Sequence, residues 1–139
     1  SHYYSITDDV PAHLVPIFSG YLLNAELRSR PALCALAPSG GRHLLDLGCG
    51  GGGALIEGSA RFAEITGVDI ALRWLVIAQK RLQEAGITAR LVCADAASLP
   101  FANGRFSHIM ASDLLENTRS PTAVIQQCGA MLERAGRLY

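Results

Sequence analysis

The residues with the clearest chemical potential lie in one short stretch, where an apolar run that carries an acid enters a block of glycines. The stretch is His43-Leu-Leu-Asp-Leu-Gly-Cys-Gly-Gly-Gly-Gly53. An apolar run of this length that ends in glycine is typical of a buried strand. Glycines directly after a strand let the backbone turn sharply toward a ligand, and the amides that open the next helix then face that ligand. The stretch therefore predicts a loop that holds a nucleotide-like cofactor.

Two cofactor classes fit this loop. Gly48, Gly50 and Gly53 match the fingerprint of dinucleotide-binding proteins, and Asp69 follows at the distance which that fingerprint expects. An NAD-dependent oxidoreductase is therefore one interpretation. Asp46 favours another, because a buried carboxylate needs a partner. Two residues before the first glycine, it would repel a pyrophosphate and attract a cationic ammonium or sulfonium.

Alternating strands and helices would position the loop. Apolar residues at helical spacing over 16–37 predict a helix, and Pro31 predicts the start of a second, short one. Strands are predicted at 43–47, 64–69, 89–94 and 106–111, and helices at 53–63, 71–84 and 121–134. Ser120 is the expected N-cap of the last helix, and a fifth strand is expected to begin at Arg137. The pattern predicts an α/β fold, a Rossmann-like, doubly wound and mostly parallel sheet with helices on both faces.

Two regions are expected along the chain. Residues 1–41 form an N-terminal helical segment, a candidate lid, and residues 42–139 form the cofactor-binding domain. Because the pattern stops near strand 5, we expect the C-terminal strands of this domain to be missing. The N-terminal aromatic residues would either cover an acceptor or pack within the helix, and their helical spacing favours packing. These aromatic residues are Tyr3, Tyr4, Phe18 and Tyr21, with His13 beside them.

The composition of the chain limits the classes of binding partner that we expect. Half of the residues are hydrophobic, 17% are charged, and 12 basic side chains balance 12 acidic ones, so we expect a folded domain without a nucleic-acid footprint. The apolar runs are too short to span a bilayer, so no membrane partner is expected. Cys34, Cys49, Cys93 and Cys128 form no CxxC pair, which favours reduced thiols and a cytoplasmic protein and gives no metal site. A small-molecule acceptor is the expected partner, and self-association into a homo-oligomer is left open.

Several ordered segments together resemble the class I S-adenosylmethionine-dependent methyltransferases. Leu44-Leu-Asp-Leu-Gly-Cys-Gly50 is similar to the first motif of that family, and Thr66-Gly-Val-Asp-Ile70 to the second. Cys93-Ala-Asp-Ala-Ala-Ser-Leu-Pro-Phe101 resembles the third, and Phe106-Ser-His-Ile-Met110 the fourth-strand motif. Leu114-Leu-Glu-Asn and the later 131–138 resemble the approach to strand 5. The similarity covers roughly 44–139 and is greatest to the branch that methylates small molecules.

The resemblance implies roles for individual residues. Asp46 would accept from the amino group of the cofactor's methionine part, and Asp69 from both ribose hydroxyls. Ile70 would pack on the adenine, while Asp95 and the amide of Ala96 would meet its edge. The other residues expected to line the cofactor are Gly48, Cys49, Gly50, Gly52 and Ser112. The thiol of Cys49 is interpreted as a small packing group.

The family resemblance implies methyl transfer from S-adenosylmethionine to a small molecule, with S-adenosylhomocysteine as product. A sulfonium methyl group is already activated, so alignment can supply much of the rate, and no fixed catalytic residue is predicted. Asn117 departs from the family pattern, because the small-molecule branch often has His there. Besides the oxidoreductase, a non-catalytic cofactor-binding domain therefore stays an alternative.

Overall fold

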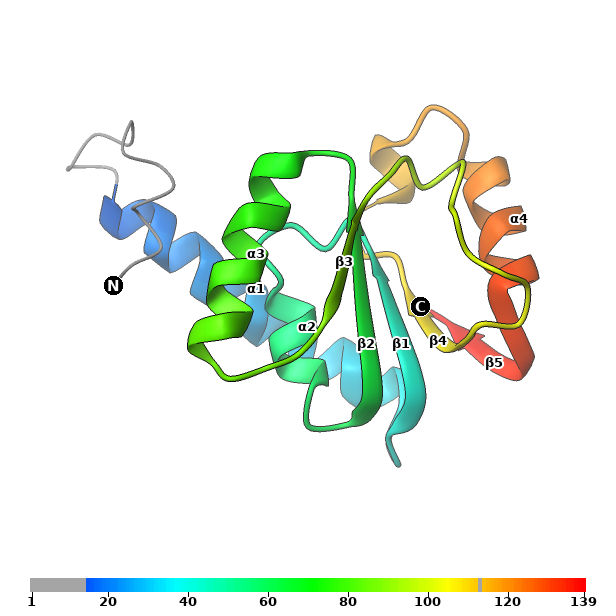
Figure 1. Ribbon diagram of the computed structural model, residues 1–139, viewed down its shortest axis with the longest axis horizontal. Helices are drawn as coiled ribbons and strands as arrows, with labels where there is room; N and C mark the ends of the chain where they lie inside the picture. Colours follow the sequence, from blue (N-terminus) through cyan, green and yellow to red (C-terminus); the bar gives the residue numbers. More distant parts are fainter. Residues whose placement is uncertain (1–14, 113) are drawn as a thin grey trace.

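The computed structural model describes residues 15–112 and 114–139 as one five-stranded sheet with helices packed on it (Figure 1). Tyr3, Tyr4 and His13, named above, lie outside the described residues, as do the side chains of Phe18 and Tyr21. The elements follow in the order α1 (Val15–Leu36), β1 (Gly41–Leu47), α2 (Gly53–Gly58), β2 (Phe62–Asp69), α3 (Leu72–Glu84), β3 (Arg90–Cys93), β4 (Phe106–Met110), the 3-10 turn η3 (Leu115–Asn117), α4 (Pro121–Met131) and β5 (Leu132–Leu138).

The sheet has the strand order β3-β2-β1-β4-β5, and all of its pairings are parallel. The chain first adds strands on one side of β1 and then returns to add β4 and β5 on the other side. Ligands of open α/β sheets bind at such a reversal, in the crevice outside the carboxyl ends of the strands. Asp46 lies there, with Gly67 of β2 on one side and Met110 of β4 on the other.

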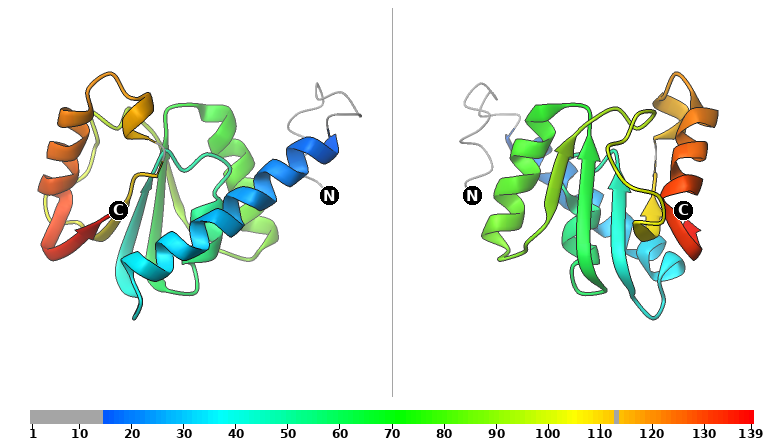
Figure 2. Two further views of the ribbon diagram at one scale, coloured as in Figure 1. Left: turned by 180° about the vertical axis from the view of Figure 1, so that it is seen from behind. Right: turned by 45° about the vertical axis from the view of Figure 1, so that its right-hand side comes forward.

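Two hydrophobic layers hold the helices on opposite faces (Figure 2). Alternate residues of β1 point to opposite faces. Leu44 packs with the residues of α1, α2 and α3, whereas Leu45 and Leu47 pack with Val124 and Cys128 of α4. The predicted α/β sheet covered on both faces is therefore confirmed.

Four predicted boundaries are wrong. Residues 15–36 form one helix through Pro31, which does not start a second one. Pro31 and Leu27 are both exposed, so solvent can hydrate the Leu27 carbonyl that loses its helical partner. The second helix ends at Gly58 instead of residue 63, because Phe62 already pairs with Gly41 in the sheet.

The last helix also ends earlier than predicted, at Met131, and β5 begins at Leu132 instead of Arg137. Leu132 pairs with Phe106 of β4, and this long-range contact overrides the local preference for helix. A fifth strand is thus present over Leu132–Leu138. Ser120 does precede the helix, but its side chain makes no capping hydrogen bond.

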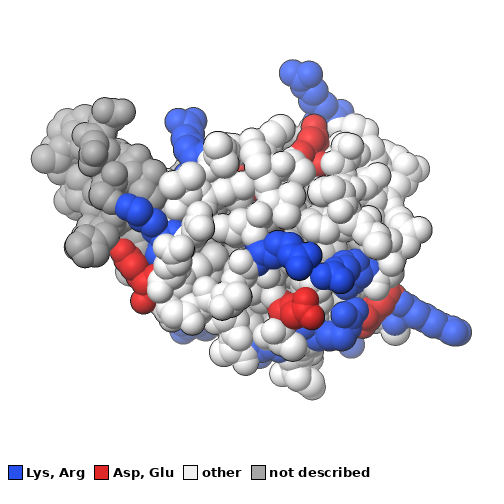
Figure 3. Space-filling view, in the orientation of Figure 1, with Lys and Arg blue, Asp and Glu red and all other residues white. Residues whose placement is uncertain are grey.

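Across the described residues, no helix combines the length and apolar character needed to cross a bilayer. On the face shown in Figure 3, basic and acidic side chains are scattered among uncharged residues. The four cysteines carry free thiols.

Candidate cofactor-binding site

The glycine loop between β1 and α2 folds back against β2. The amides of Gly48 and Cys49 both donate to the carbonyl of Val68, at 2.8 and 2.9 Å. Gly48, Gly50 and Gly52 have φ angles of 73°, 50° and 79°, a region that L side chains rarely adopt. The loop therefore needs glycine at these positions for its backbone conformation alone, and Gly48 and Gly50 present bare backbone to the cleft described below.

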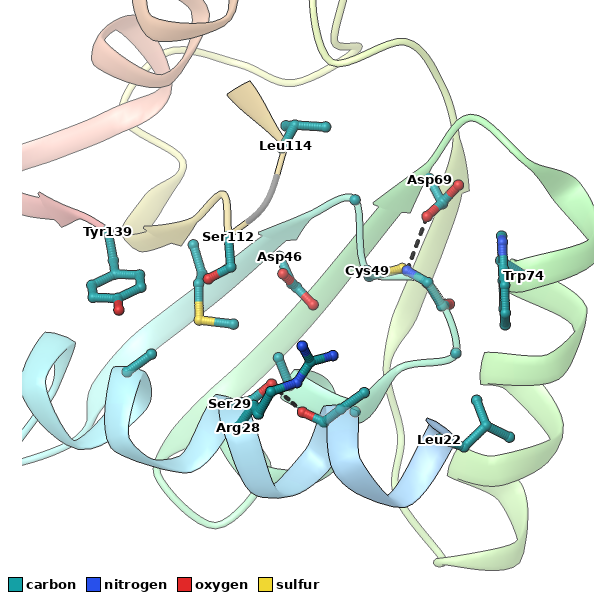
Figure 4. A pocket seen from close by; sticks show the side chains of 18 of the residues that line it. Leu22, Arg28, Ser29, Asp46, Cys49, Asp69, Trp74, Ser112, Leu114 and Tyr139 are labelled. Atoms are coloured by element: carbon teal, nitrogen blue, oxygen red, sulfur yellow. Dashed lines mark hydrogen bonds between the residues drawn. The ribbon is translucent and has the colours of Figure 1, made fainter. Parts of the chain in front are cut away.

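Asp69, at the end of β2, fastens this loop. One carboxylate oxygen accepts from the amide of Gly50 at 2.9 Å (Figure 4). The other accepts from the amide of Ala71 at 2.9 Å. Each carboxylate oxygen has two acceptor positions, so both oxygens can accept one further hydrogen bond. Asp69 can thus shape the loop and still bind a pair of ligand hydroxyls.

Asp46 lies near the end of β1 and is buried. It is only 4% exposed, and no described residue donates a hydrogen bond to its carboxylate. Burial, with a smaller contribution from the charge of Asp69, raises its pKa from 3.8 to about 7. A buried carboxylate without a partner destabilises the fold. A cation that enters the cleft would remove this cost.

A cleft of about 590 Å³ opens between the glycine loop, α1 and the end of β4. Such a volume suits a small ligand. Asp46 and Asp69 line it, and Ser112 lies on its far side (Figure 4). Arg28 of α1 also lines the cleft, and its guanidinium points toward Asp46. No ion pair joins these two side chains among the described residues, so the cleft offers a cation and an anion separately to a ligand.

A second cleft of about 540 Å³ continues past Gly48 along the ends of β2 and β3. Ile70 forms part of its wall with an apolar side chain that is 71% exposed. Asp95 and Ala96 form another part. One carboxylate oxygen of Asp95 accepts from the amide of Ala97 at 2.8 Å, so Asp95 also makes a local turn. The two clefts share Gly48, Asp69, Leu114 and Asn117, so they form one elongated groove.

The structure brings nine of the ten predicted cofactor residues to this groove. Gly52 is the exception: it is buried beneath the loop, and a Cβ there would lie 3.1 Å from the Cβ of Ala78. Cys49 lines the first cleft, and burial raises the pKa of its thiol, which keeps the thiol protonated. That state fits the interpretation of Cys49 as a packing group.

Sequence reasoning offered residues 1–41 as a candidate lid, but it assigned no site role to Arg28 or Arg81. α1 lies along the glycine loop and supplies part of the cleft wall, including Arg28 and Ser29 (Figures 2 and 4). Arg81 of α3 is 2% exposed and donates to the Gly51 carbonyl at 2.6 Å. Its place on the buried face of α3, among Ile77 and Ala78, was a signal that the sequence did contain.

Comparison with known proteins gives a consistent result. Residues 44–136 match the family model described as "Methyltransferase domain". The ubiquinone biosynthesis O-methyltransferase of Coxiella burnetii is 33% identical over 100 residues, which are 71% of this chain and 42% of that protein. The chain thus spans less than half of the length of this curated relative.

Solved structures share the fold. One is a Methanococcus maripaludis protein described as an S-adenosylmethionine-dependent methyltransferase. Its TM-score is 0.78 at 16% identity, and the match covers 92% of this chain and 60% of the other. A phosphoethanolamine N-methyltransferase of Haemonchus contortus, in complex with S-adenosylhomocysteine, has a TM-score of 0.71 at 21% identity, covering 80% and 27%. The oxidoreductase interpretation gains no support from these comparisons.

Proposed function

Because the chain belongs to the methyltransferase-domain family, we propose that it binds S-adenosylmethionine in the groove and transfers the methyl group to a small-molecule acceptor. The observation that carries this proposal is the unpaired, buried carboxylate of Asp46 in the first cleft. A cofactor with an ammonium group supplies the cation that this carboxylate lacks.

The first cleft fits the methionine part of the cofactor. This part carries an ammonium and a carboxylate on one carbon atom. Asp46 would accept from the ammonium, and Arg28, which points into the same space, would pair with the carboxylate (Figure 4). A guanidinium can hold a carboxylate by two parallel hydrogen bonds. The bare glycine loop would let the chain of the cofactor pass between them.

The second cleft fits the nucleoside part. Asp69 lies where the two clefts join, and its oxygens retain acceptor positions for the ribose hydroxyls. The exposed side chain of Ile70 offers an apolar face for the adenine ring, and Asp95 with the amide of Ala96 lies at the edge. Burial of Ile70 against the ring would contribute about 1 kcal/mol or more.

The chemistry asks little of the protein beyond alignment. When bound, the cofactor supplies an activated sulfonium methyl group. The residues around the first cleft would hold the acceptor in line with it and exclude water, and such orientation accounts for roughly 7–11 kcal/mol in favourable cases. Ser112, Asn117 and Tyr139 line the part of the first cleft that the segments after β4 and β5 and the turn η3 contribute. We propose this part for the acceptor, and α1, within residues 1–41, as the cover of the methionine end.

Calorimetric titration with S-adenosylhomocysteine tests the cofactor assignment. We expect micromolar binding by the folded protein and no binding of NADH under the same conditions. Asp46→Asn should abolish binding at pH 8 while the far-UV spectrum is unchanged. Folded protein that ignores millimolar S-adenosylhomocysteine would refute the proposal. Binding without methyl transfer to any hydroxyl, amine or thiol acceptor would favour a non-catalytic domain.

A further inference from the structure

A buried arginine connects three elements around the proposed cofactor site. The Nη1 atom of Arg81 in α3 donates to the carbonyl of Gly51 in the glycine loop at 2.6 Å. Its Nη2 atom forms an ion pair with the Glu26 carboxylate of α1. The Arg81 side chain is 2% exposed and the Glu26 side chain 20%, so this pair is largely removed from solvent.

The α1 backbone approaches the loop closely beside this ion pair. A Cβ on Gly53 would lie 2.9 Å from the Glu26 nitrogen and 3.1 Å from the carbonyl carbon of Ala25. A Cβ on Gly51 would lie 2.6 Å from Cδ2 of Leu22 and 3.2 Å from Nη1 of Arg81. The absence of side chains at 51 and 53 thus lets α1 lie directly on the loop, where the ion pair fixes it.

The loop is held from two directions at successive residues. Asp69 accepts from the amide of Gly50, and Arg81 donates to the carbonyl of Gly51. On α1, Glu26 lies between Leu22 and Ser29 at helical spacing, and both of those residues line the first cleft. Glu26 therefore sets the rotation of α1 that presents Arg28 and Ser29 to the cleft.

We propose that Arg81 is a positioning residue that couples the docking of α1 to the conformation of the glycine loop, so that cofactor binding and α1 docking strengthen each other. The part of this proposal that concerns the cofactor rests on the proposed function. The part that links α1 to the glycine loop does not depend on the proposed function. Coupled sites respond reciprocally, so a ligand that orders the loop must also order α1.

Glu26→Gln is the sharpest variant, because it keeps the size of the side chain and removes its charge. Arg81→Lys keeps the charge but loses the two-pronged geometry, and should be intermediate. Glu57→Gln is the matched control. Glu57 of α2 pairs with Arg30 of α1 through two hydrogen bonds of 2.9 Å, and neither residue lines the clefts or touches the loop.

The first readout needs no cofactor. Amide hydrogen exchange in the unliganded protein should accelerate over 48–53 in Glu26→Gln and stay unchanged there in Glu57→Gln. Both variants lose one ion pair of α1, so a merely structural role would affect the loop equally in both. Equal loop exchange in the two variants, or loop exchange in Glu26→Gln that matches the wild type, overturns the proposal.

The second readout uses S-adenosylhomocysteine as the probe. In the wild type we expect it to protect the amides of both 48–53 and 22–33. In Glu26→Gln, protection should be confined to the loop and affinity should fall about tenfold, with less than a twofold change in Glu57→Gln. Unchanged affinity with protection of α1 retained in Glu26→Gln overturns the coupling. Failure of the wild type to bind would overturn the proposed function instead, and the first readout would still decide the link.

Discussion

Replacement of Asp46 by Asn should raise the stability of the folded chain while it abolishes cofactor binding. The pKa of Asp46 rises from 3.8 to about 7 in the folded chain, mainly through burial. At about 1.4 kcal/mol for each tenfold change, ionised Asp46 destabilises the folded chain by about 4 kcal/mol above pH 7. A buried amide without partners costs about 2 kcal/mol itself. We therefore expect Asp46→Asn to be about 2 kcal/mol more stable than the wild type at pH 8.

The sign of the pH dependence follows from proton uptake. Between pH 4 and pH 7 the folded state keeps the Asp46 proton that the unfolded state loses, so Asp46 lowers stability as pH rises through this window. At pH 5 only about 2 kcal/mol of the cost has appeared, and the variant should then match the wild type within about 1 kcal/mol. Urea unfolding of both proteins at pH 5 and pH 8 measures the difference. A variant less stable than the wild type at pH 8, or a difference independent of pH, would refute the reasoning.

Four further outcomes are expected. In the wild type, affinity for S-adenosylhomocysteine should rise about tenfold from pH 6 to pH 8, because only ionised Asp46 attracts the ammonium. Titration calorimetry at both pH values measures this change, and equal affinities would contradict it. Arg28→Met should weaken the binding of S-adenosylhomocysteine but leave the binding of adenosine, which has no carboxylate, unchanged. Equal losses of affinity for the two ligands in paired titrations would contradict this. Asp69→Asn should weaken the binding of both ligands, because the amide nitrogen of Asn cannot accept a hydrogen bond from the amide of Gly50 or Ala71. Adenosine binding equal to that of the wild type would count against this. Gly53→Ala should destabilise the chain by about 1–3 kcal/mol in urea unfolding, because the added Cβ would meet the α1 backbone. A variant as stable as the wild type would mean that α1 can shift away from the loop.

The glycine loop and its acids were predictable because their signals are local. A strand, a run of glycines and a helix start follow one another within 43–58, and Asp69 closes the next strand. Side-chain alternation and glycine conformation decide such elements without help from distant residues. The parallel pairing of the strands also follows from the alternation of strands and helices. The strand order does not, because β3 and β4 follow one another in the chain but lie on opposite sides of the β2-β1 pair.

The errors occur where distant contacts decide. Leu132 and Glu133 are acceptable in a helix, yet β4 recruits them into the sheet, and Ala135 then turns with a φ of 65°. Arg81 meets Glu26 across a separation of 55 residues (81 − 26) that no periodicity links. The chain order alone therefore could not show which residues of α1 line the first cleft.

The two acids at the head of the sheet show how the fold divides stability from function. Asp69 receives backbone amides on both oxygens, whereas Asp46 receives no hydrogen bond from the described residues and is made harder to ionise by its neighbour. A chain that maximised stability would place an apolar residue at 46, since Leu44, Leu45 and Leu47 around it are fully buried. Departures from local consistency mark functional positions, where the missing partner comes from outside the chain. The same carboxylate that weakens the empty domain near neutral pH would thus become its strongest contact once a cation binds, which is why stability and affinity should respond in opposite directions to Asp46→Asn.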